Sequence, residues 1–299
     1  MATELLAILW APFLMCLVLT GIHAYLGVHV LAREVVFVDI AMAQIAALGA
    51  TAAFLAGYEV EHWQSYAYSL AATLLGAGVL SITRSRRRHV SQEAVIGIVY
   101  AVSSAAAVLL ADRVPHGAEQ VRTMLVGNLL AVRPLEVAHV AALYAAVGLL
   151  HWVCRRPFML ISTDPDAAYA GGYRVRWWDF VFYASFGVVV ASSVRVAGVL
   201  LVFSYLIVPA LAGVLLGGTV GARLFIGWAF GTLVSVVGMV ASAVFDLPTG
   251  ATVVCAFGVV LVAFWTATRL SRRLAALGTR GAVSGAGTGS GRRAGTRSP

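Results

Sequence analysis

Two polar side chains stand inside an apolar run of this sequence and are the first candidates for chemistry. Asp39 and Gln44 lie within residues 35–57, which are otherwise mostly aliphatic and small. A carboxylate inside a membrane span costs about 2.5–3.5 kcal/mol on insertion scales, so such a residue usually faces a cavity or a partner. Asp39 is therefore the best functional candidate, with pairing to Arg33 or to solvent as the alternative. Gln44 can offer a carbonyl oxygen or hydrogen-bond to a neighbouring helix.

The histidines and cysteines are too scattered to predict a bound cofactor. His23 and His29 are six residues apart in one apolar run, which places them on different faces of a helix. His139 and His151 are twelve residues apart, too far to share an ion directly. The three cysteines form no C-x-x-C pair, so neither a disulfide framework nor a thiolate metal site is expected.

The chain contains no lysine among its 21 basic residues, and this excludes two chemistries. A Walker A site needs a lysine to reach the β- and γ-phosphates, and a retinal Schiff base needs a lysine amine. The H-E-x-x-H and G-x-S-x-G motifs are also missing, which disfavours a membrane protease or a lipid-modifying enzyme. We expect no enzymatic activity, and any ATP hydrolysis would belong to another subunit.

The elements that must position these residues are apolar helices. The chain is 61% hydrophobic and 11% charged, with a mean hydropathy of +0.90. About 20 apolar residues of helix cross a membrane, and the long continuous runs favour an all-α transmembrane bundle over a barrel. Eight or nine spans are predicted, because two runs meet around Arg195. The runs are 5–31, 35–57, 66–83, 93–111, 135–153, 178–196, 197–217, 222–244 and 248–268.

Arginines indicate which loops are cytoplasmic. Residues 84–88 carry four arginines and no acid, and Arg155, Arg156, Arg174 and Arg176 follow the same pattern. The positive-inside rule places these loops in the cytoplasm. Membrane lipid and topology account for the net charge of +8, so nucleic-acid binding is not expected. The first residues lack the positive region of a signal peptide, so the first run is expected to remain as a span.

Three segments depart from simple spans. Residues 123–133 are apolar but too short to cross, which predicts a half-helix or re-entrant piece. Pro209 lies inside an apolar run and is expected to kink its helix. We expect a transmembrane domain over 1–273 and a disordered, Gly-, Ser- and Arg-rich cytoplasmic tail over 274–299.

The most polar cytoplasmic loop, residues 162–173, predicts a short helix. Thr163 or Asp164 can cap its start, and Pro165 suits the first helical position. Ala167 to Ala170 favour helix, and Gly171 or Gly172 can end it. On local pattern alone this is an ordinary loop helix.

Seven segments, taken in order, resemble the permease subunits of ABC importers for zinc, manganese or iron(II), the ABC-3 family. The resemblance covers residues 5–268 and lies in the segments Val35–Gly49, Val95–Ile98, Leu125–Leu130, Asp164–Gly171, Val196–Val202, Ile207–Ala210 and Asp246–Gly250.

The resemblance implies a set of partners. Two permease copies would form the channel, two ATPase subunits would bind on the cytoplasmic side, and an extracytoplasmic metal-binding protein would deliver the ion. The loop helix would be the coupling helix that docks on the ATPase. Its matching residues are Asp164, Pro165, Asp166, Ala167, Tyr169, Ala170 and Gly171.

The family places its ion on the second span, where members carry Asp-x-x-Ser-His. This sequence departs from that pattern, because Asp39 is followed four residues later by Ala43 and the span has no histidine. Alignment from Gly49 puts Gln44 where the histidine would stand. The resemblance therefore implies Asp39 and Gln44 as metal ligands. Five residues turn a regular helix so that the two side chains point roughly 140° apart, a separation that a π-bulge would reduce.

Two other transport functions remain open on the sequence. One is a permease for larger metal chelates of the siderophore or cobalamin type. The other is a proton-driven secondary carrier, which would need no coupling helix. All of these predict a multi-pass protein of a bacterial cell membrane, and the sequence does not say which metal moves.

Overall fold

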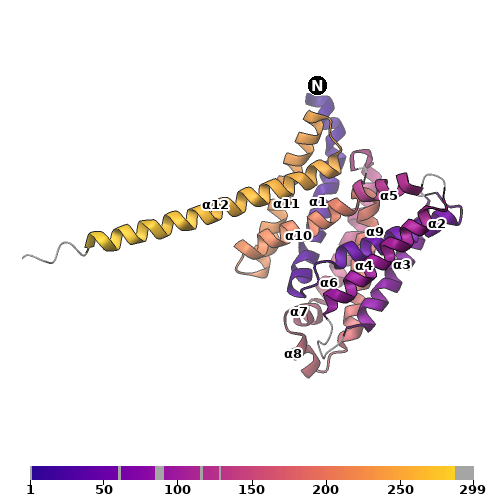
Figure 1. The fold of residues 1–299 in the computed structure, drawn as a ribbon, viewed down its shortest axis with the longest axis horizontal. Helices are drawn as coiled ribbons and strands as arrows, with labels where there is room; N and C mark the ends of the chain where they lie inside the picture. The colour runs from indigo at the N-terminus through magenta and orange to yellow at the C-terminus, as the bar shows by residue number, and fades with distance from the viewer. Residues whose placement is uncertain (1, 60–61, 85–90, 115–116, 128, 287–299) are drawn as a thin grey trace, which may run out of the picture. The chain divides into compact units, whose positions relative to one another are not determined.

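The structure, a computed structural model, describes residues 2–59, 62–84, 91–114, 117–127 and 129–286 (Figure 1). Those residues form α-helices and one 3-10 helix, η1, with no strand among them. In chain order the elements are α1 (Ala2–Ala32), α2 (Val38–Leu55), α3 (Trp63–Ile82), α4 (Gln92–Ala111), α5 (Gly117–Val126), η1 (Leu129–Ala131), α6 (Pro134–Val153), α7 (Arg155–Thr163), α8 (Pro165–Ala170), α9 (Val175–Ala197), α10 (Val199–Leu216), α11 (Val220–Phe245) and α12 (Thr249–Ala286).

Nine helices in the described part of the chain are long and apolar enough to cross a membrane. They are α1, α2, α3, α4, α6, α9, α10, α11 and the first part of α12. The predicted all-α bundle of eight or nine spans is confirmed, with nine as the number. The half-helix expected at 123–133 is also present, as the end of the ten-residue α5 followed by η1.

One glycine resolves the doubt about the span count around Arg195. Gly198 stands alone between α9 and α10 with φ 77° and ψ 159°. Glycine reaches positive φ without the steric cost that a Cβ adds, so one residue is enough to end α9 and begin α10. Two separate spans therefore meet with almost no loop between them.

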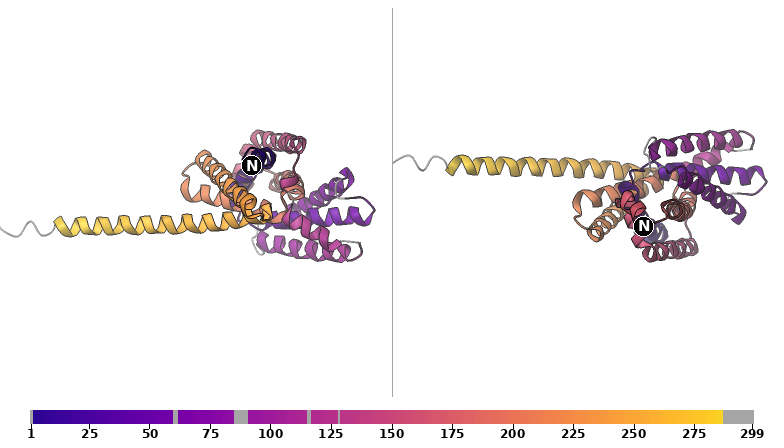
Figure 2. Two further views of the ribbon diagram at one scale, coloured as in Figure 1. Left: turned by 90° about the horizontal axis from the view of Figure 1, so that it is seen from above. Right: turned by 90° about the horizontal axis from the view of Figure 1, so that it is seen from below.

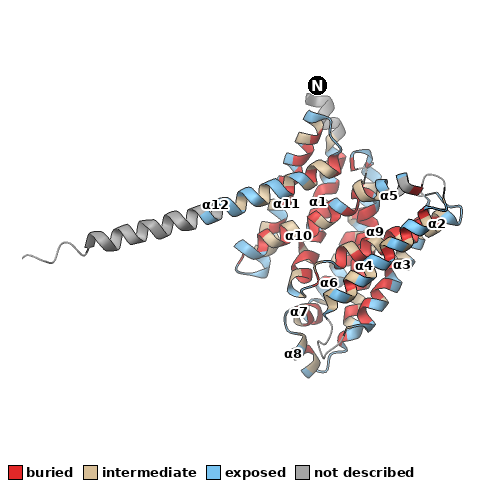
Figure 3. Ribbon diagram, in the orientation of Figure 1, coloured by how far each residue is buried: buried red, intermediate tan, exposed pale blue. Residues whose placement is uncertain are grey.

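Large aromatic side chains fill the centre of the bundle. Tyr183, Phe182 and Phe186 of α9 and Tyr205 of α10 are fully buried. Helix α9 packs against α2 and α3, and α10 packs against α1 and α11. The views in Figure 2 agree with these contacts, with α2 to α4 grouped together and α10 and α11 forming a separate group. Helices α1, α2 and α9 are among the most heavily buried in Figure 3.

The outer helices expose apolar side chains. Ile98 and Leu109 of α4 and Leu149 and Trp152 of α6 are all exposed. An apolar surface of this kind is costly in water but compatible with lipid chains, and tryptophan is favoured at the membrane interface. The exposure pattern therefore agrees with a membrane location for these helices.

The chain divides into two compact units between residues 257 and 258. The first is Met1–Phe257 and the second is Gly258–Pro299. Helix α12 continues to Ala286, so residues 274–286 are helical where the sequence predicted a disordered tail. Residues 287–299 lie outside the described part, and the tail beyond Ala286 stays a prediction. Helix α10 runs continuously through Pro209, whose expected kink also stays a prediction.

Candidate metal path and coupling site

Asp39 is a buried carboxylate without a partner. It lies in the first turn of α2 and has no exposed surface. Neither of its carboxylate oxygens has a hydrogen-bond partner in the described structure. The alternative that Asp39 pairs with Arg33 is wrong, because Arg33 binds Asp179 instead. A buried polar group without a partner is costly, so Asp39 is held where a cation or a proton can satisfy it.

Gln44 does not share the face of Asp39. Helix α2 is a regular α-helix from Val38 to Leu55 without a π-bulge, so the roughly 140° between the two side chains remains. Gln44 is only partly buried, whereas Asp39 is fully buried. Among the described residues, no group of three His, Cys, Asp or Glu side chains is arranged to hold a metal ion. The pairing of Asp39 with Gln44 therefore stays a prediction.

The face of α2 that carries Asp39 continues as small residues. Ala43, Ala46 and Ala50 follow Asp39 at helical spacing, four, seven and eleven residues later. Ala46 and Ala50 line a cavity of about 70 Å³ together with Thr123 and Arg195. The cavity lies about 10 Å along the helix from Asp39, on the side away from the arginine-rich loops. The small side chains leave space on the same face as the buried carboxylate.

Two glycines from different loops meet next to this cavity. Gly127 follows α5 and Gly198 joins α9 to α10, both with positive φ. A Cβ added to Gly198 would lie 2.5 Å from the Val126 carbonyl carbon and would also overlap the backbone of Gly127. The end of α5 therefore packs directly on the α9–α10 turn, and only glycine permits this approach.

The predicted loop helix forms as α8, directly after α7. The Asp164 carboxylate accepts a hydrogen bond from the Ala167 amide at 2.9 Å, so Asp164 is the N-cap. Pro165 occupies the first position and Gly171 follows the last residue, Ala170. Ala167 and Ala170 are exposed. The local prediction is confirmed, and α8 presents small side chains to its surroundings.

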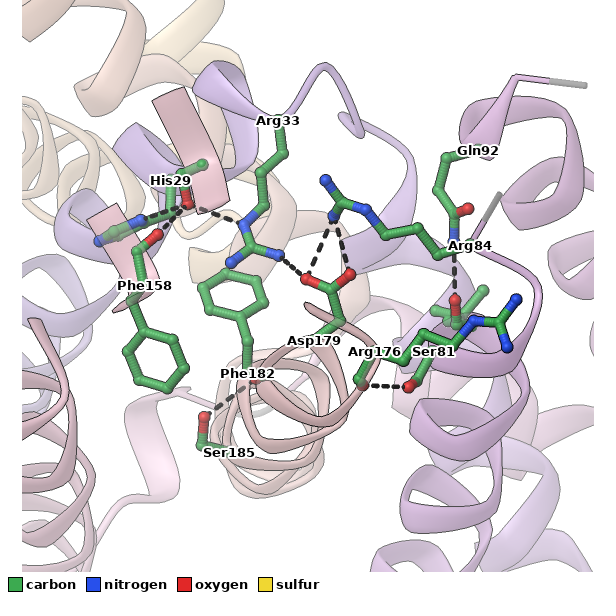
Figure 4. A network of polar contacts seen from close by, with 12 residues as sticks. His29, Arg33, Ser81, Arg84, Gln92, Phe158, Arg176, Asp179, Phe182 and Ser185 are labelled. Carbon is green, nitrogen blue, oxygen red and sulfur yellow. Dashed lines mark hydrogen bonds and ion pairs between the residues drawn. The ribbon is translucent and has the colours of Figure 1, made fainter. Parts of the chain in front are cut away.

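Two arginines and one aspartate join three spans beside α8 (Figure 4). Arg33 follows α1 and its Nη1 lies 2.7 Å from an Asp179 oxygen. Arg84 follows α3 and its Nη1 lies 3.0 Å from the other oxygen. Asp179 belongs to α9, and both its side chain and that of Arg33 have no exposed surface. This buried ion-pair cluster links the cytoplasmic ends of α1, α3 and α9.

Ser162 of α7 connects the cluster to the coupling region. Its hydroxyl donates to the Phe158 carbonyl oxygen at 2.7 Å, so its own oxygen is left to accept. Arg33 Nε donates to that oxygen at 2.8 Å, and His29 Nδ1 lies 2.9 Å from it. Ser162 is two residues before the α8 cap, Asp164. A shift of α7 and α8 must therefore disturb contacts made by α1 and α9.

Sequence reasoning missed Asp179 and the roles of Arg33 and Arg84. Asp179 carries the same signal as Asp39, an acid within an apolar run. That signal was sufficient to select it, but nothing in the sequence indicated which arginines it would meet, because Arg33 is 146 residues away.

The histidines that the sequence separated are brought together but are already engaged. His29 and His151 have ring centroids 6.5 Å apart. His151 Nε2 lies 2.8 Å from Ser185, whose hydroxyl donates to the Phe182 carbonyl oxygen. His23 contacts the Leu19 carbonyl oxygen and the Ser193 hydroxyl. Each of these three histidines therefore bonds to a serine of a neighbouring helix.

Comparison with known proteins places the whole bundle in one family. The sequence profile of the ABC 3 transport family matches residues 6–267. This chain belongs to the ABC-3 family. The match includes Asp39, the cluster around Asp179 and α8, so all of the features above lie within the family domain.

Individual relatives of this ABC-3 protein are distant. It is 26% identical over 183 residues to the manganese transport system membrane protein MntC of Listeria innocua, covering 61% of this chain and 64% of that relative. It is 25% identical over 193 residues to a protein of Haemophilus influenzae named "Probable iron transport system membrane protein", covering 64% of this chain and 69% of the relative.

A solved structure shares the fold. The structure of PsaBC from Streptococcus pneumoniae in complex with Fab superposes with a TM-score of 0.72 at 19% identity, covering 88% of this chain and 94% of that chain. With nine apolar helices and membrane transport proteins as relatives, the ABC-3 protein is a multi-pass protein of the bacterial cell membrane.

Proposed function

We propose that this ABC-3 protein is the permease subunit of an ABC importer that moves a divalent metal ion, with manganese as the preferred cargo. The single observation that carries the proposal is Asp39, which is fully buried in a span and whose two oxygens have no hydrogen-bond partner in the segments that the structure describes. A passing cation would supply the missing partner. The manganese and iron transport relatives support the same class of cargo.

Oxygen ligands favour manganese over zinc. The α2 face offers a carboxylate from Asp39 and no histidine or cysteine. Carboxylate, carbonyl and water oxygens suit manganese, whereas zinc is commonly held by imidazole and thiolate. In this proposal Asp39 contacts the ion during passage, and the space beside Ala46 and Ala50 is part of the path. Gln44 contributes only if α2 changes its winding.

The motor of the importer is a separate ATPase that docks on α8. The chain has no lysine for a Walker A site. The exposed Ala167 and Ala170 leave room for a partner surface against α8. ATP-driven movement of α8 would pass through α7 and Ser162 to the cluster around Asp179. Alternating access would follow from the changed packing of α1, α3 and α9. An extracytoplasmic binding protein would supply the ion and a second permease copy would complete the channel.

The decisive experiment compares Asp39→Asn with Asp246→Asn in metal-depleted cells and in reconstituted vesicles. Asparagine keeps the shape of the side chain but removes the charge, and Asp246 is an exposed turn residue outside the path. We expect Asp39→Asn to lower manganese uptake at least tenfold, since losing even an indirect metal contact costs about 10–100-fold. Asp246→Asn should transport like the parent chain.

The same preparation separates the alternatives. Uptake that requires ATP and persists without a proton gradient supports the importer. Uptake that is lost with the proton gradient and needs no ATPase would contradict the importer and indicate a proton-driven secondary carrier. Uptake of metal chelates but not of free manganese would show that the cargo is a metal chelate. Normal manganese transport by Asp39→Asn would remove Asp39 from the ion path.

A further inference from the structure

A long apolar groove opens on the bundle between α1, α6 and α11. Its volume is about 800 Å³. Along its length the lining is aliphatic, from side chains such as Val18 and Ile22 of α1, Ala141 of α6 and Leu224 of α11. The groove differs from the Asp39 region, because no acidic side chain lines it.

Basic side chains mark one end of the groove. Arg155 and Arg156 begin α7 and line the groove, and both are exposed. Neither forms an ion pair with an acid in the described part of the chain. The Arg155 guanidinium carbon lies 5.2 Å from the centre of the Trp152 ring, which is itself exposed. Arginine beside tryptophan is the arrangement that membrane proteins favour at the headgroup level.

The polar side chains on the inner wall do not compete for the same occupant. His29 and His151 are hydrogen-bonded to Ser162 and Ser185, and Tyr144 is hydrogen-bonded to Ser193. His29 Nδ1, both ring nitrogens of His151 and the Tyr144 hydroxyl are therefore engaged within the protein. The groove therefore offers apolar contact along its aliphatic lining. At one end it offers Arg155 and Arg156, which form no ion pair within the described residues.

We infer that this groove binds one anionic phospholipid of the cytoplasmic leaflet. An acyl chain lies along the aliphatic lining, and the phosphate contacts Arg155 and Arg156. The positive-inside rule puts these arginines at the cytoplasmic surface, where anionic lipids attract basic side chains. Charge complementarity favours a lipid over a second copy of this chain, which would have to bring an acid to the same place.

The proposed site has a structural consequence for α7. The headgroup would hold the first turn of α7, whose last turn carries Ser162 and leads into the α8 cap. Lipid binding would therefore restrain the segment that contacts Arg33. Lipid binding does not depend on which ion the protein moves, because it rests on the groove and on the charge of Arg155 and Arg156.

The test measures lipid retention by the full chain. The protein is reconstituted in nanodiscs of phosphatidylcholine with a minor fraction of phosphatidylglycerol, released, and the lipid that stays bound is counted by native mass spectrometry. Arg155→Gln combined with Arg156→Gln should lower phosphatidylglycerol retention about 25-fold, because each basic residue contributes about fivefold near an anionic headgroup. Arg174→Gln with Arg176→Gln removes two exposed arginines elsewhere on the cytoplasmic side and should change little.

A second variant fills the groove without removing charge. A Cβ added at Gly148 meets nothing within 4 Å, so Gly148→Leu extends into open space and should not disturb the fold. It should lower retention by blocking the acyl chain. Three outcomes overturn the proposal: equal retention in all variants, an equal loss in the Arg174 and Arg176 control, or loss of a dimer without loss of lipid, which would assign the groove to a second copy.

Discussion

At the scale of single residues, the protein contains two buried carboxylates with opposite circumstances. Asp179 is neutralised by Arg33 and Arg84, whereas neither Asp39 oxygen has a hydrogen-bond partner among the described residues. Removing one member of a buried ion pair leaves a charge uncompensated, which is far more costly than losing an exposed pair. We therefore expect Asp179 to stabilise the fold. We expect the free-energy cost of burying Asp39 to depend on what this carboxylate binds.

This difference predicts opposite effects of the same substitution. Asp179→Asn should lower the free energy of unfolding by about 3–5 kcal/mol, because Arg33 would remain buried and unpaired. Asp39→Asn should leave stability unchanged or raise it, since asparagine carries no charge into the core. Unfolding of the purified protein in detergent, followed by circular dichroism, measures both.

The control for this pair is Asp166→Asn, which removes an exposed carboxylate from α8. It should change the free energy of unfolding by less than about 0.5 kcal/mol. A loss for Asp179→Asn no larger than that of Asp166→Asn would contradict the role assigned to the cluster.

At the scale of elements, the contact between α5 and the α9–α10 turn depends on a residue without a side chain. Gly198 combines two requirements, a positive φ and direct backbone contact with residues 126 and 127. Gly172 has the same φ of 77° but faces open space. Gly198 also has a ψ of 159°, a backbone conformation open almost only to glycine, so replacement there combines greater backbone strain with close packing.

We expect Gly198→Ala to destabilise the protein more than Gly172→Ala. Alanine at Gly172 should cost about 1–2 kcal/mol, the price of a left-handed backbone for a residue with a Cβ. Alanine at Gly198 adds an overlap with main-chain atoms that cannot rotate away. Thermal unfolding of the two variants in the same detergent provides the comparison, and equal losses would mean that the α5 contact has no energetic role.

The face of α2 provides a second prediction at this scale. Ala50→Leu should fill the cavity of about 70 Å³ and reduce metal uptake, whereas Ala52→Leu, on another face of α2, should transport normally. Radioactive manganese uptake at equal expression is the measurement. If both variants transport alike, the cavity does not belong to the path.

At the scale of the whole molecule, the proposed ion site at Asp39 and the proposed ATPase-docking site at α8 are separate. Packed helices connect the two sites. Asp39 lies within α2, α8 lies beyond α7, and the Asp179 cluster together with Ser162 connects the helices that surround them. A substitution at either site should therefore stop transport. At Asp39 it should do so by impairing ion binding, and at α8 by impairing assembly with the ATPase.

Substitution at α8 should separate assembly from ion binding. Ala170→Arg places a long charged side chain on the exposed face of α8 and should prevent co-purification of the ATPase. Thr83→Arg adds the same charge at the exposed cytoplasmic end of α3 and should leave assembly intact. Asp39→Asn should also assemble but lose metal-stimulated ATP hydrolysis. Co-purification unaffected by Ala170→Arg would move the docking site away from α8.

The sequence by itself determined the class of fold, the spans and the local form of the coupling helix. Hydropathy acts over about 20 consecutive residues, and the α8 cap needs only Asp164, Pro165 and Gly171 in order, so both are properties of the local chain. Glycine at 198 also allowed two adjacent spans, although the sequence left their number between eight and nine.

Only the tertiary structure decided which polar residues meet. Asp39 and Asp179 look alike in sequence, yet packing brings Arg33 to Asp179 across 146 residues and gives Asp39 no hydrogen-bond partner within the described part of the chain. The close contact of Gly127 with Gly198 and the basic end of the groove at Arg155 arise in the same way. The reason is physical: hydrophobic patterning fixes that a helix is buried but is non-directional, whereas ion pairs and backbone contacts depend on distances that exist only after the helices pack.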